Sequence, residues 1–242
     1  MTARQRRPAG AGALSRSTAW LVLAALVLAG AGGEDPAAQY DRLFASHDYG
    51  ALAERLKHGM EAAPTALPTL AWEQRRVTAG GSVFVGAMYA LDLLAAGQGG
   101  KDPAGEARTR ESAVVVALYT LAAIETDGTR CADAAAPVAR RRQFVQILTP
   151  AWAELRKLPD ESVAADLALA LMQERDRAAT RPADDYLCRG RTDDIPDSVA
   201  GGAVAVAPRF AAPRESAARA AAIRAQLPGL LTEFAARLKT GS

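Results

Sequence analysis

Apolar residues recur at helical spacing along most of this chain. Leu52 and Leu56 stand one helical turn apart, as do Leu167 and Leu171, and polar residues separate them. No stretch shows a sustained alternation of polar and branched residues, which is the pattern of a half-buried strand. The spacing therefore predicts an all-α fold.

Turn signals divide this pattern into about seven helices. Asp35 precedes Pro36, and Asp48 precedes Tyr49, so each aspartate is placed to cap the start of a helix. The expected helices cover approximately residues 36–46, 49–61, 69–96, 104–125, 137–157, 160–179 and 213–238. Short turns between most of them predict stacked antiparallel helix hairpins.

Three helices of this set contain residues that disfavour a continuous helix. Paired glycines, Gly80 and Gly81, predict a kink or short break in the third helix, because glycine has a poor helix propensity. Pro150 predicts a bend in the fifth helix, and Pro228 predicts a kink in the last one.

Two segments are apolar on nearly every face. They cover residues 83–94 and 113–124, and we expect both to be buried helices at the centre of the fold. The valines at 114–116 would also suit a buried strand. The length of the surrounding helical pattern and its flanking charged residues favour a helix.

Residues 180–212 form the longest region without a helical pattern. A loop of this length is uncommon in a compact domain and is usually either functional or mobile. The run of glycine, alanine and valine at 201–206 favours mobility.

The N-terminus has the pattern of a secretory signal peptide. Four arginines and no acid precede an apolar run at 19–29, which ends in the small residues Ala29, Gly30 and Ala31. The run is too short to span a bilayer comfortably, since a span takes about 20 residues. We expect residues 1–31 to be cleaved and residues 32–242 to form a single helical domain, without stable membrane insertion afterwards.

The charge of the expected mature chain differs from that of the whole sequence. The full chain has 29 basic and 27 acidic residues, and the four arginines of the signal segment leave 25 basic residues and a net charge of −2. A surface of mixed sign gives no reason to expect nucleic acid as a partner. The alanine- and arginine-rich composition is typical of a bacterial gene of high GC content, so the periplasm is the expected location, with secretion as the alternative.

Two cysteines, Cys131 and Cys188, predict one disulfide. An isolated pair in an exported protein usually forms a bridge. Helices 137–157 and 160–179 should form an antiparallel hairpin, which brings the start of the first and the end of the second together. One cysteine precedes this hairpin and the other follows it.

One segment resembles a single unit of a Sel1-type helix-hairpin repeat. The resemblance rests on Gly86-Ala87-Met88-Tyr89, on the glycine-rich loop at 97–102 and on Glu106-Ala107. Such repeats form solenoids of at least about three units. Because no second copy keeps these positions, the resemblance implies a local helix hairpin and no family.

The candidate pocket residues are three acids in apolar surroundings. Asp92 interrupts an apolar helix, so it is expected either to pair with an arginine such as Arg75 or Arg110, or to line a pocket with a raised pKa. Glu111 and Glu125 are its possible acidic partners.

No motif for a metal or a cofactor is present, and none is predicted. Five aspartates of the long loop lack the spacing of a calcium-binding loop, and both histidines lie far from the cysteines. These aspartates are Asp184, Asp185, Asp193, Asp194 and Asp197, and the histidines are His47 and His58.

These observations predict a binding, adaptor or assembly protein of the bacterial envelope. Helix hairpins present grooves that accept a peptide or a partner helix without catalytic residues. An unidentified envelope protein or peptide is therefore the expected partner. The alternative is a cell-wall-directed hydrolase, in which Asp92 acts with Glu111 or Glu125 across a cleft.

Overall fold

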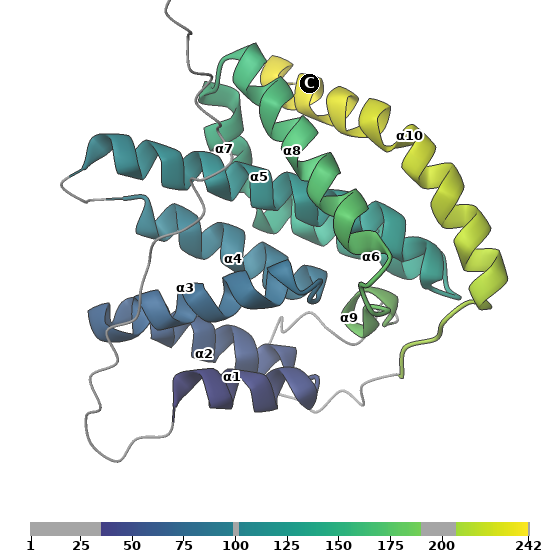
Figure 1. Ribbon diagram of the computed structural model, residues 1–242, viewed down its shortest axis with the longest axis horizontal. Helices are drawn as coiled ribbons and strands as arrows, with labels where there is room; N and C mark the ends of the chain where they lie inside the picture. Colours follow the sequence, from purple (N-terminus) through teal and green to yellow (C-terminus); the bar gives the residue numbers. More distant parts are fainter. Residues whose placement is uncertain (1–34, 99–101, 190–206, 242) are drawn as a thin grey trace, which may run out of the picture. The chain divides into compact units, whose positions relative to one another are not determined.

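The computed structural model describes residues 35–98, 102–189 and 207–241. In these residues it contains α-helices and no strand, which confirms the all-α prediction (Figure 1). The elements are α1 (Pro36–Ala45), α2 (Tyr49–Glu61), α3 (Ala63–Thr78), α4 (Val83–Ala96), α5 (Pro103–Asp127), the 3-10 turn η2 (Gly128–Arg130), α6 (Ala135–Ile147), α7 (Thr149–Lys157), α8 (Asp160–Ala178), α9 (Asp185–Cys188) and α10 (Pro213–Thr240).

The first two helices begin where their caps predict. The carboxylate of Asp35 accepts a hydrogen bond from the Ala37 N–H, and that of Asp48 accepts one from the Ala51 N–H. Each bond satisfies an N–H group that has no partner within its own helix. The bounds of α2 equal the predicted ones.

Among the described residues more helices form than the seven predicted, because the chain breaks at the glycine pair, where a kink or short break was expected, and at Pro150, where a bend was expected, and because α9 forms in the long loop. Gly80 has φ of 76°, a left-handed conformation that glycine adopts without steric cost, and it separates α3 from α4. Pro150 lies in the first turn of the separate helix α7, so the predicted bend is a break. In contrast, Pro68 lies inside α3, which begins six residues earlier than predicted.

The core centres on α4 and α5. Residues 113–124 of α5 are buried without interruption, and they form a helix, as predicted, rather than a strand. A Cβ atom at Gly86 of α4 would stand 2.4 Å from the Thr120 hydroxyl oxygen of α5. Glycine at this position therefore lets the two helices approach each other closely. Tyr40 of α1 and Trp72 of α3 extend the core on one side, with ring centroids 5.2 Å apart.

The helices stack in chain order, so that α1 to α4 lie on one side of α5 and α8 and α10 on the other (Figure 1). The end of α10 that carries the C-terminus packs through Leu227, Leu231 and Phe234, and α8 packs against α5. None of the described helices combines the length and the apolar character that a bilayer span requires.

The long region at 180–212 is partly structured. It contains the short helix α9, and Ala211 N–H donates a hydrogen bond of 2.8 Å to the Arg130 carbonyl. The signal segment predicted at 1–31 and the mobile run predicted at 201–206 lie outside the described residues.

Candidate functional site

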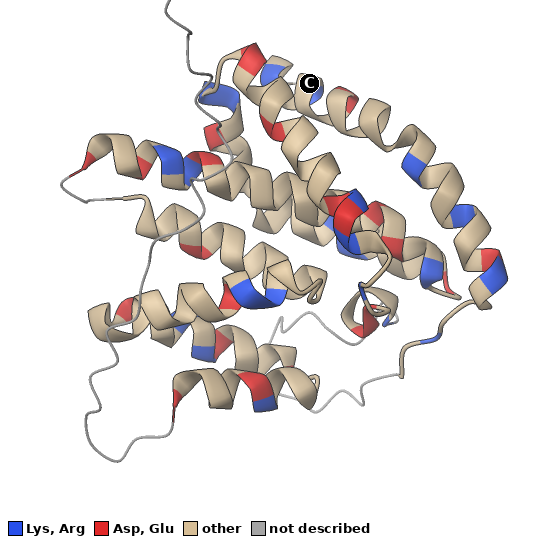
Figure 2. Cartoon of the chain, in the orientation of Figure 1, with Lys and Arg blue, Asp and Glu red and all other residues tan. Residues whose placement is uncertain are grey.

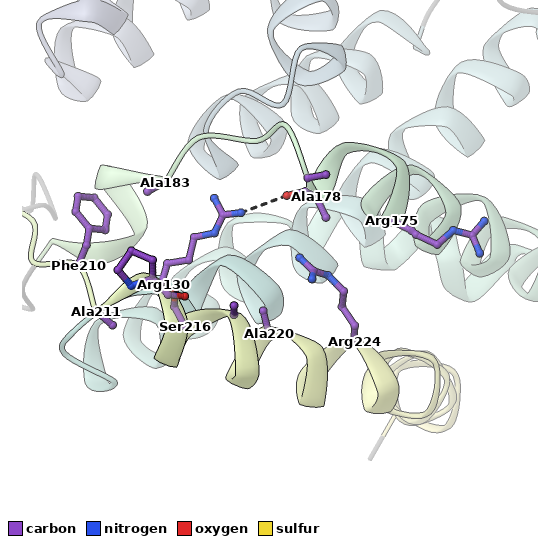
Figure 3. A pocket seen from close by; sticks show the side chains of 12 residues that line it. Arg130, Arg175, Ala178, Ala183, Phe210, Ala211, Ser216, Ala220 and Arg224 are labelled. Atoms are coloured by element: carbon purple, nitrogen blue, oxygen red, sulfur yellow. Dashed lines mark hydrogen bonds between the residues drawn. The ribbon is translucent and has the colours of Figure 1, made fainter.

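A groove opens between α8 and α10, with a volume of about 720 Å³ (Figure 3). One end is closed by η2 and by the segment that leads into α10. Among the described residues, three arginines, Arg130, Arg175 and Arg224, line the groove, and no acidic residue does. Small side chains make up most of the remaining lining, namely Ala178, Ala179, Ala183, Ser216, Ala217 and Ala220.

The three arginines differ in how firmly they are held. Arg130 donates hydrogen bonds to the carbonyls of Arg181 and Ala178, at 2.7 and 3.2 Å, so it is part of the groove wall. Arg224 lies 3.7 Å from Glu174, and Arg175 lies 3.8 Å from Asp176. Arg175 and Asp176 are both exposed, so their pair contributes little free energy, and the 3.7 Å between Arg224 and the buried Glu174 is longer than a hydrogen bond. Both side chains are therefore available to an anionic group in the groove.

Figure 2 shows that basic positions recur along the half of α10 that stands away from α8. These positions are Arg214, Arg219 and Arg224, of which Arg219 is paired with Glu215 on the same helix.

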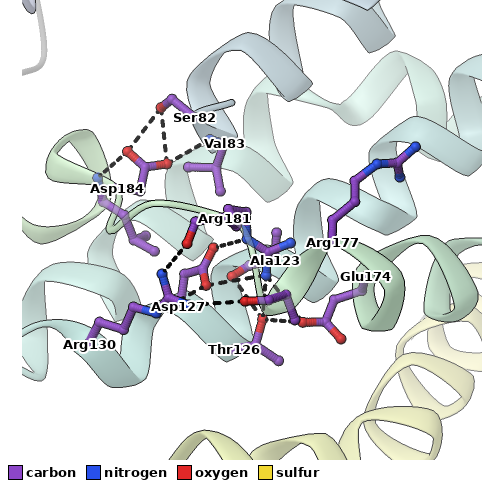
Figure 4. A network of polar contacts seen from close by, with 12 residues as sticks. Ser82, Val83, Ala123, Thr126, Asp127, Arg130, Glu174, Arg177, Arg181 and Asp184 are labelled. Atoms are coloured by element: carbon purple, nitrogen blue, oxygen red, sulfur yellow. Dashed lines mark hydrogen bonds and ion pairs between the residues drawn. The ribbon is translucent and has the colours of Figure 1, made fainter. Parts of the chain in front are cut away.

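A buried ionic network lies directly behind the groove (Figure 4). The Arg181 guanidinium, 2% exposed, donates hydrogen bonds to both carboxylate oxygens of Asp127 and one to Glu174. Thr126 donates to the same Glu174 oxygen at 2.8 Å. Burial raises the pKa of Asp127, and the charge of Arg181 opposes this rise. Arg130 lies 3.7 Å from Asp127, and Arg224 lies 3.7 Å from Glu174, so two of the three groove arginines border this network.

Asp184 joins the beginnings of two helices. Its carboxylate accepts hydrogen bonds from the Ser82 hydroxyl and the Val83 N–H of α4, and from the Tyr186 N–H of α9. Burial raises its pKa to about 6, while the bonds from Val83 and Ser82 oppose the rise. In the sequence, Asp184 was grouped with the aspartates of the long loop. In the structure its carboxylate caps helix N-termini instead.

Cys131 and Cys188 form the predicted disulfide, with their Cα atoms 5.0 Å apart. Cys131 follows η2, and Cys188 ends α9. The backbone beside Cys131 also pairs with Phe210, a residue that lines the groove. The disulfide therefore ties one end of the groove to α9.

The structure gives each of the three predicted pocket acids a different partner. Asp92 lies beside the buried carboxyl group of Glu73 of α3 rather than beside an arginine. Burial raises the pKa of Glu73 well above its usual value and that of Asp92 to about 6.

The other two acids belong to separate clusters. Glu111 faces Asp166 of α8, whose pKa is raised to about 7 by burial and by the Glu111 charge. Glu125 lies 2.6 Å from Arg141 and forms an ion pair with it. None of these three candidates lines the groove.

Histidine occupies one polar cluster that the sequence did not indicate. His47 has φ of 58° and lies 2.7 Å from Asp185, which also accepts a hydrogen bond of 2.5 Å from the Tyr49 hydroxyl. This cluster joins the turn before α2 to α9. In the described part of the chain, no three His, Cys, Asp or Glu side chains gather as a metal site would require.

Sequence reasoning missed the groove and the arginines that line it. Arg130, Arg175 and Arg224 come from three separate elements, and no motif links them. The spacing of small residues on α8 and α10 was the one available signal. Comparisons with protein-family models, curated proteins and solved structures gave no match.

Proposed function

We propose that this chain is an exported binding protein of the bacterial envelope, which holds an acidic partner protein or peptide in the groove between α8 and α10. The observation that carries the proposal is the lining of the groove, which, in the part of the chain that the structure describes, has three arginines and no acid over a floor of small residues. Complementary charge promotes association and orients the partner.

The N-terminal sequence supports the location. Its arginines, its short apolar run and its small residues at 29–31 are typical of a cleavable export signal. A disulfide between the two cysteines of the chain suits an oxidising compartment such as the periplasm.

The alternative, a hydrolase that acts on cell-wall material, receives less support. Such an enzyme needs two carboxyl groups about 5 to 10 Å apart across an open cleft. The groove contains no carboxylate, and Asp92, Glu111 and Glu125 have different partners. The binding role therefore has the better physical basis.

Site-specific photo-crosslinking in a bacterial host tests the proposal. A benzophenone side chain is placed at Ala217, which is exposed and lines the groove, in a tagged full-length chain. After irradiation, the form recovered from the envelope fraction, expected to begin near Gly32, should carry a protein adduct. Arg224→Glu should reduce the adduct by about tenfold, because it places an acid opposite an acidic partner.

The controls lie on the same helix. A benzophenone at Ala236, which is exposed but outside the groove, should give no matching adduct. Arg237→Glu makes the same charge change about 20 Å further along α10 and should leave the Ala217 adduct unchanged. The proposal is overturned if Ala217 gives no adduct or if both positions give equal adducts. It is also overturned if Arg224→Glu leaves the Ala217 adduct unchanged.

A further inference from the structure

The two halves of α10 are packed differently. Its C-terminal half buries Leu227, Leu231 and Phe234 against the rest of the fold, whereas its N-terminal half buries only the small residues Ser216 and Ala220. In Figure 1, α10 lies close to α8 near the C-terminus and separates from it toward its own N-terminus. The groove fills this separation, and α8 and α10 form two of its walls.

The occupant that fits this space is a third helix. We infer that the groove binds an amphipathic acidic helix of the partner, about three turns long; this inference rests on the proposed function. The groove follows α10 from Pro213 to Arg224, a distance of about 16 Å at 1.5 Å per residue. About eleven residues of a partner helix span the same length.

The small side chains on both walls support a helical occupant. Ala178 and Ala179 face the groove from α8, and Ala217 and Ala220 face it from α10. Small residues at a contact allow the backbones of packed helices to come close together. A partner helix with small or apolar residues along one face can therefore rest between the two walls.

The arginines set the charge of the occupant. Arg224 and Arg175 stand toward one end of the groove, whereas Arg130 and the half-exposed ring of Phe210 stand at the other end. An acidic residue near each end of the partner helix would meet a guanidinium, and apolar residues between them would cover the alanines. This is the pattern of a helix that docks into a groove through one face.

An extended peptide suits the groove less well. Its backbone would need hydrogen-bond partners, and α8 and α10 use their own backbone groups internally. The one extended part of the lining is already paired, because Ala132 N–H donates to the Arg209 carbonyl at 2.9 Å and Ala211 N–H donates to the Arg130 carbonyl. A helix satisfies its own backbone and brings only side chains to the groove.

The test uses synthetic peptides and the form of the protein purified from the envelope fraction. The probe is a lactam-bridged helical peptide of about 12 residues, made of alanine and leucine with glutamate in its first and last turns. Matched peptides carry lysine in place of glutamate, or proline in place of the central alanine. Binding is measured by fluorescence anisotropy, with decanoate as a competing apolar anion.

The acidic helical peptide should bind, and both matched peptides should bind at least about tenfold more weakly. Arg224→Glu should weaken the binding of the acidic peptide by about tenfold, while Arg237→Glu should leave its affinity unchanged. The inference is overturned if the proline peptide binds as tightly as the helical one, or if the lysine peptide binds more tightly. It is also overturned if decanoate binds and the acidic helical peptide does not.

The two proposals fail in distinguishable ways. If the Ala217 adduct forms and depends on Arg224 but the helical peptide does not bind, the helix inference is wrong and the binding role stands. If the adduct is absent and the peptide does not bind, both are wrong.

Discussion

Two regions of this molecule bury acidic side chains by different means. Between α3 and α4, Glu73 is fully buried beside Asp92, and burial together with the Asp92 charge raises the pKa of Glu73, so that Glu73 keeps its proton. At the junction of α5 and α8, Asp127 and Glu174 are buried against the guanidinium of Arg181. The cost of burying a carboxylate is therefore met by a proton in one region and by a cation in the other.

The difference predicts how each region responds to its surroundings. The stability of a region in which a buried carboxyl group keeps its proton depends on pH, because the proton leaves as the pH rises. A pair neutralised by arginine depends on the geometry of its hydrogen bonds, since arginine stays charged under ordinary conditions. Substitutions in each region can separate these two dependences.

The largest expected effect is that of Arg181→Met. This change removes the cation and leaves Asp127 and Glu174 buried without it. We expect a loss of about 3 to 5 kcal/mol in the free energy of unfolding, measured by urea denaturation. Arg175→Met, at a side chain that is 76% exposed, is the control and should change stability by no more than about 0.5 kcal/mol. Equal losses in the two variants would contradict the network.

A smaller, pH-dependent effect is expected for Glu73→Gln. In the unfolded chain Glu73 loses its proton near pH 4, whereas burial in the folded state keeps the proton bound to a higher pH. Over this interval the folded state holds more protons, so the free energy of unfolding falls as the pH rises, by at most about 1.4 kcal/mol per unit for one proton. Glutamine has nearly the same shape as a protonated glutamate and does not titrate.

The variant should therefore be more stable than the original chain by about 2 kcal/mol at pH 8 and about equal to it at pH 4. Urea denaturation at several pH values measures the slope. Asp166 and Asp184 also have raised pKa values, so part of the slope remains. Glu54→Gln, at an exposed position, should leave the slope unchanged. If the free energy of unfolding has the same slope against pH in Glu73→Gln and in the original chain, Glu73 does not hold the titrating proton.

The smallest effect is expected for Thr126→Val. The Thr126 hydroxyl donates to Glu174 at 2.8 Å and accepts from Arg181 at 3.2 Å, so valine removes both bonds while keeping the shape. We expect the free energy of unfolding, measured by urea denaturation, to fall by about 1 kcal/mol, and its pH dependence to stay the same. Thr109→Val, whose hydroxyl bonds only within α5, is the matched variant. A loss for Thr109→Val as large as that for Thr126→Val would show that the network bonds add nothing.

Local signals in the sequence predicted the helices well. The caps at Asp35 and Asp48, the break at Gly80 and the buried helix around Val115 all depend on neighbouring residues, which a sequence displays directly. The disulfide was also predicted correctly from the cysteine pair, although α6, α7 and α8 pack chiefly against α5 and not against one another as the expected hairpin requires.

The candidate site depends on long-range geometry, so little of it could be predicted. The neighbour of Asp92 is Glu73 on the preceding helix. Glu73 stands next to other polar residues in the sequence, so nothing in the pattern indicated that it is buried. The groove exists because one half of α10 stands away from α8, and no pattern within either helix shows that separation.

The hydrogen bonds of Asp184 make the start of α4 depend on a distant segment. The helix has a local cap, because the Ser82 hydroxyl accepts from the Phe84 N–H, but the acceptor of the Val83 N–H comes from a residue 101 positions later. A chain truncated before residue 184 would therefore keep the local cap of α4 and lose the acceptor of its first N–H.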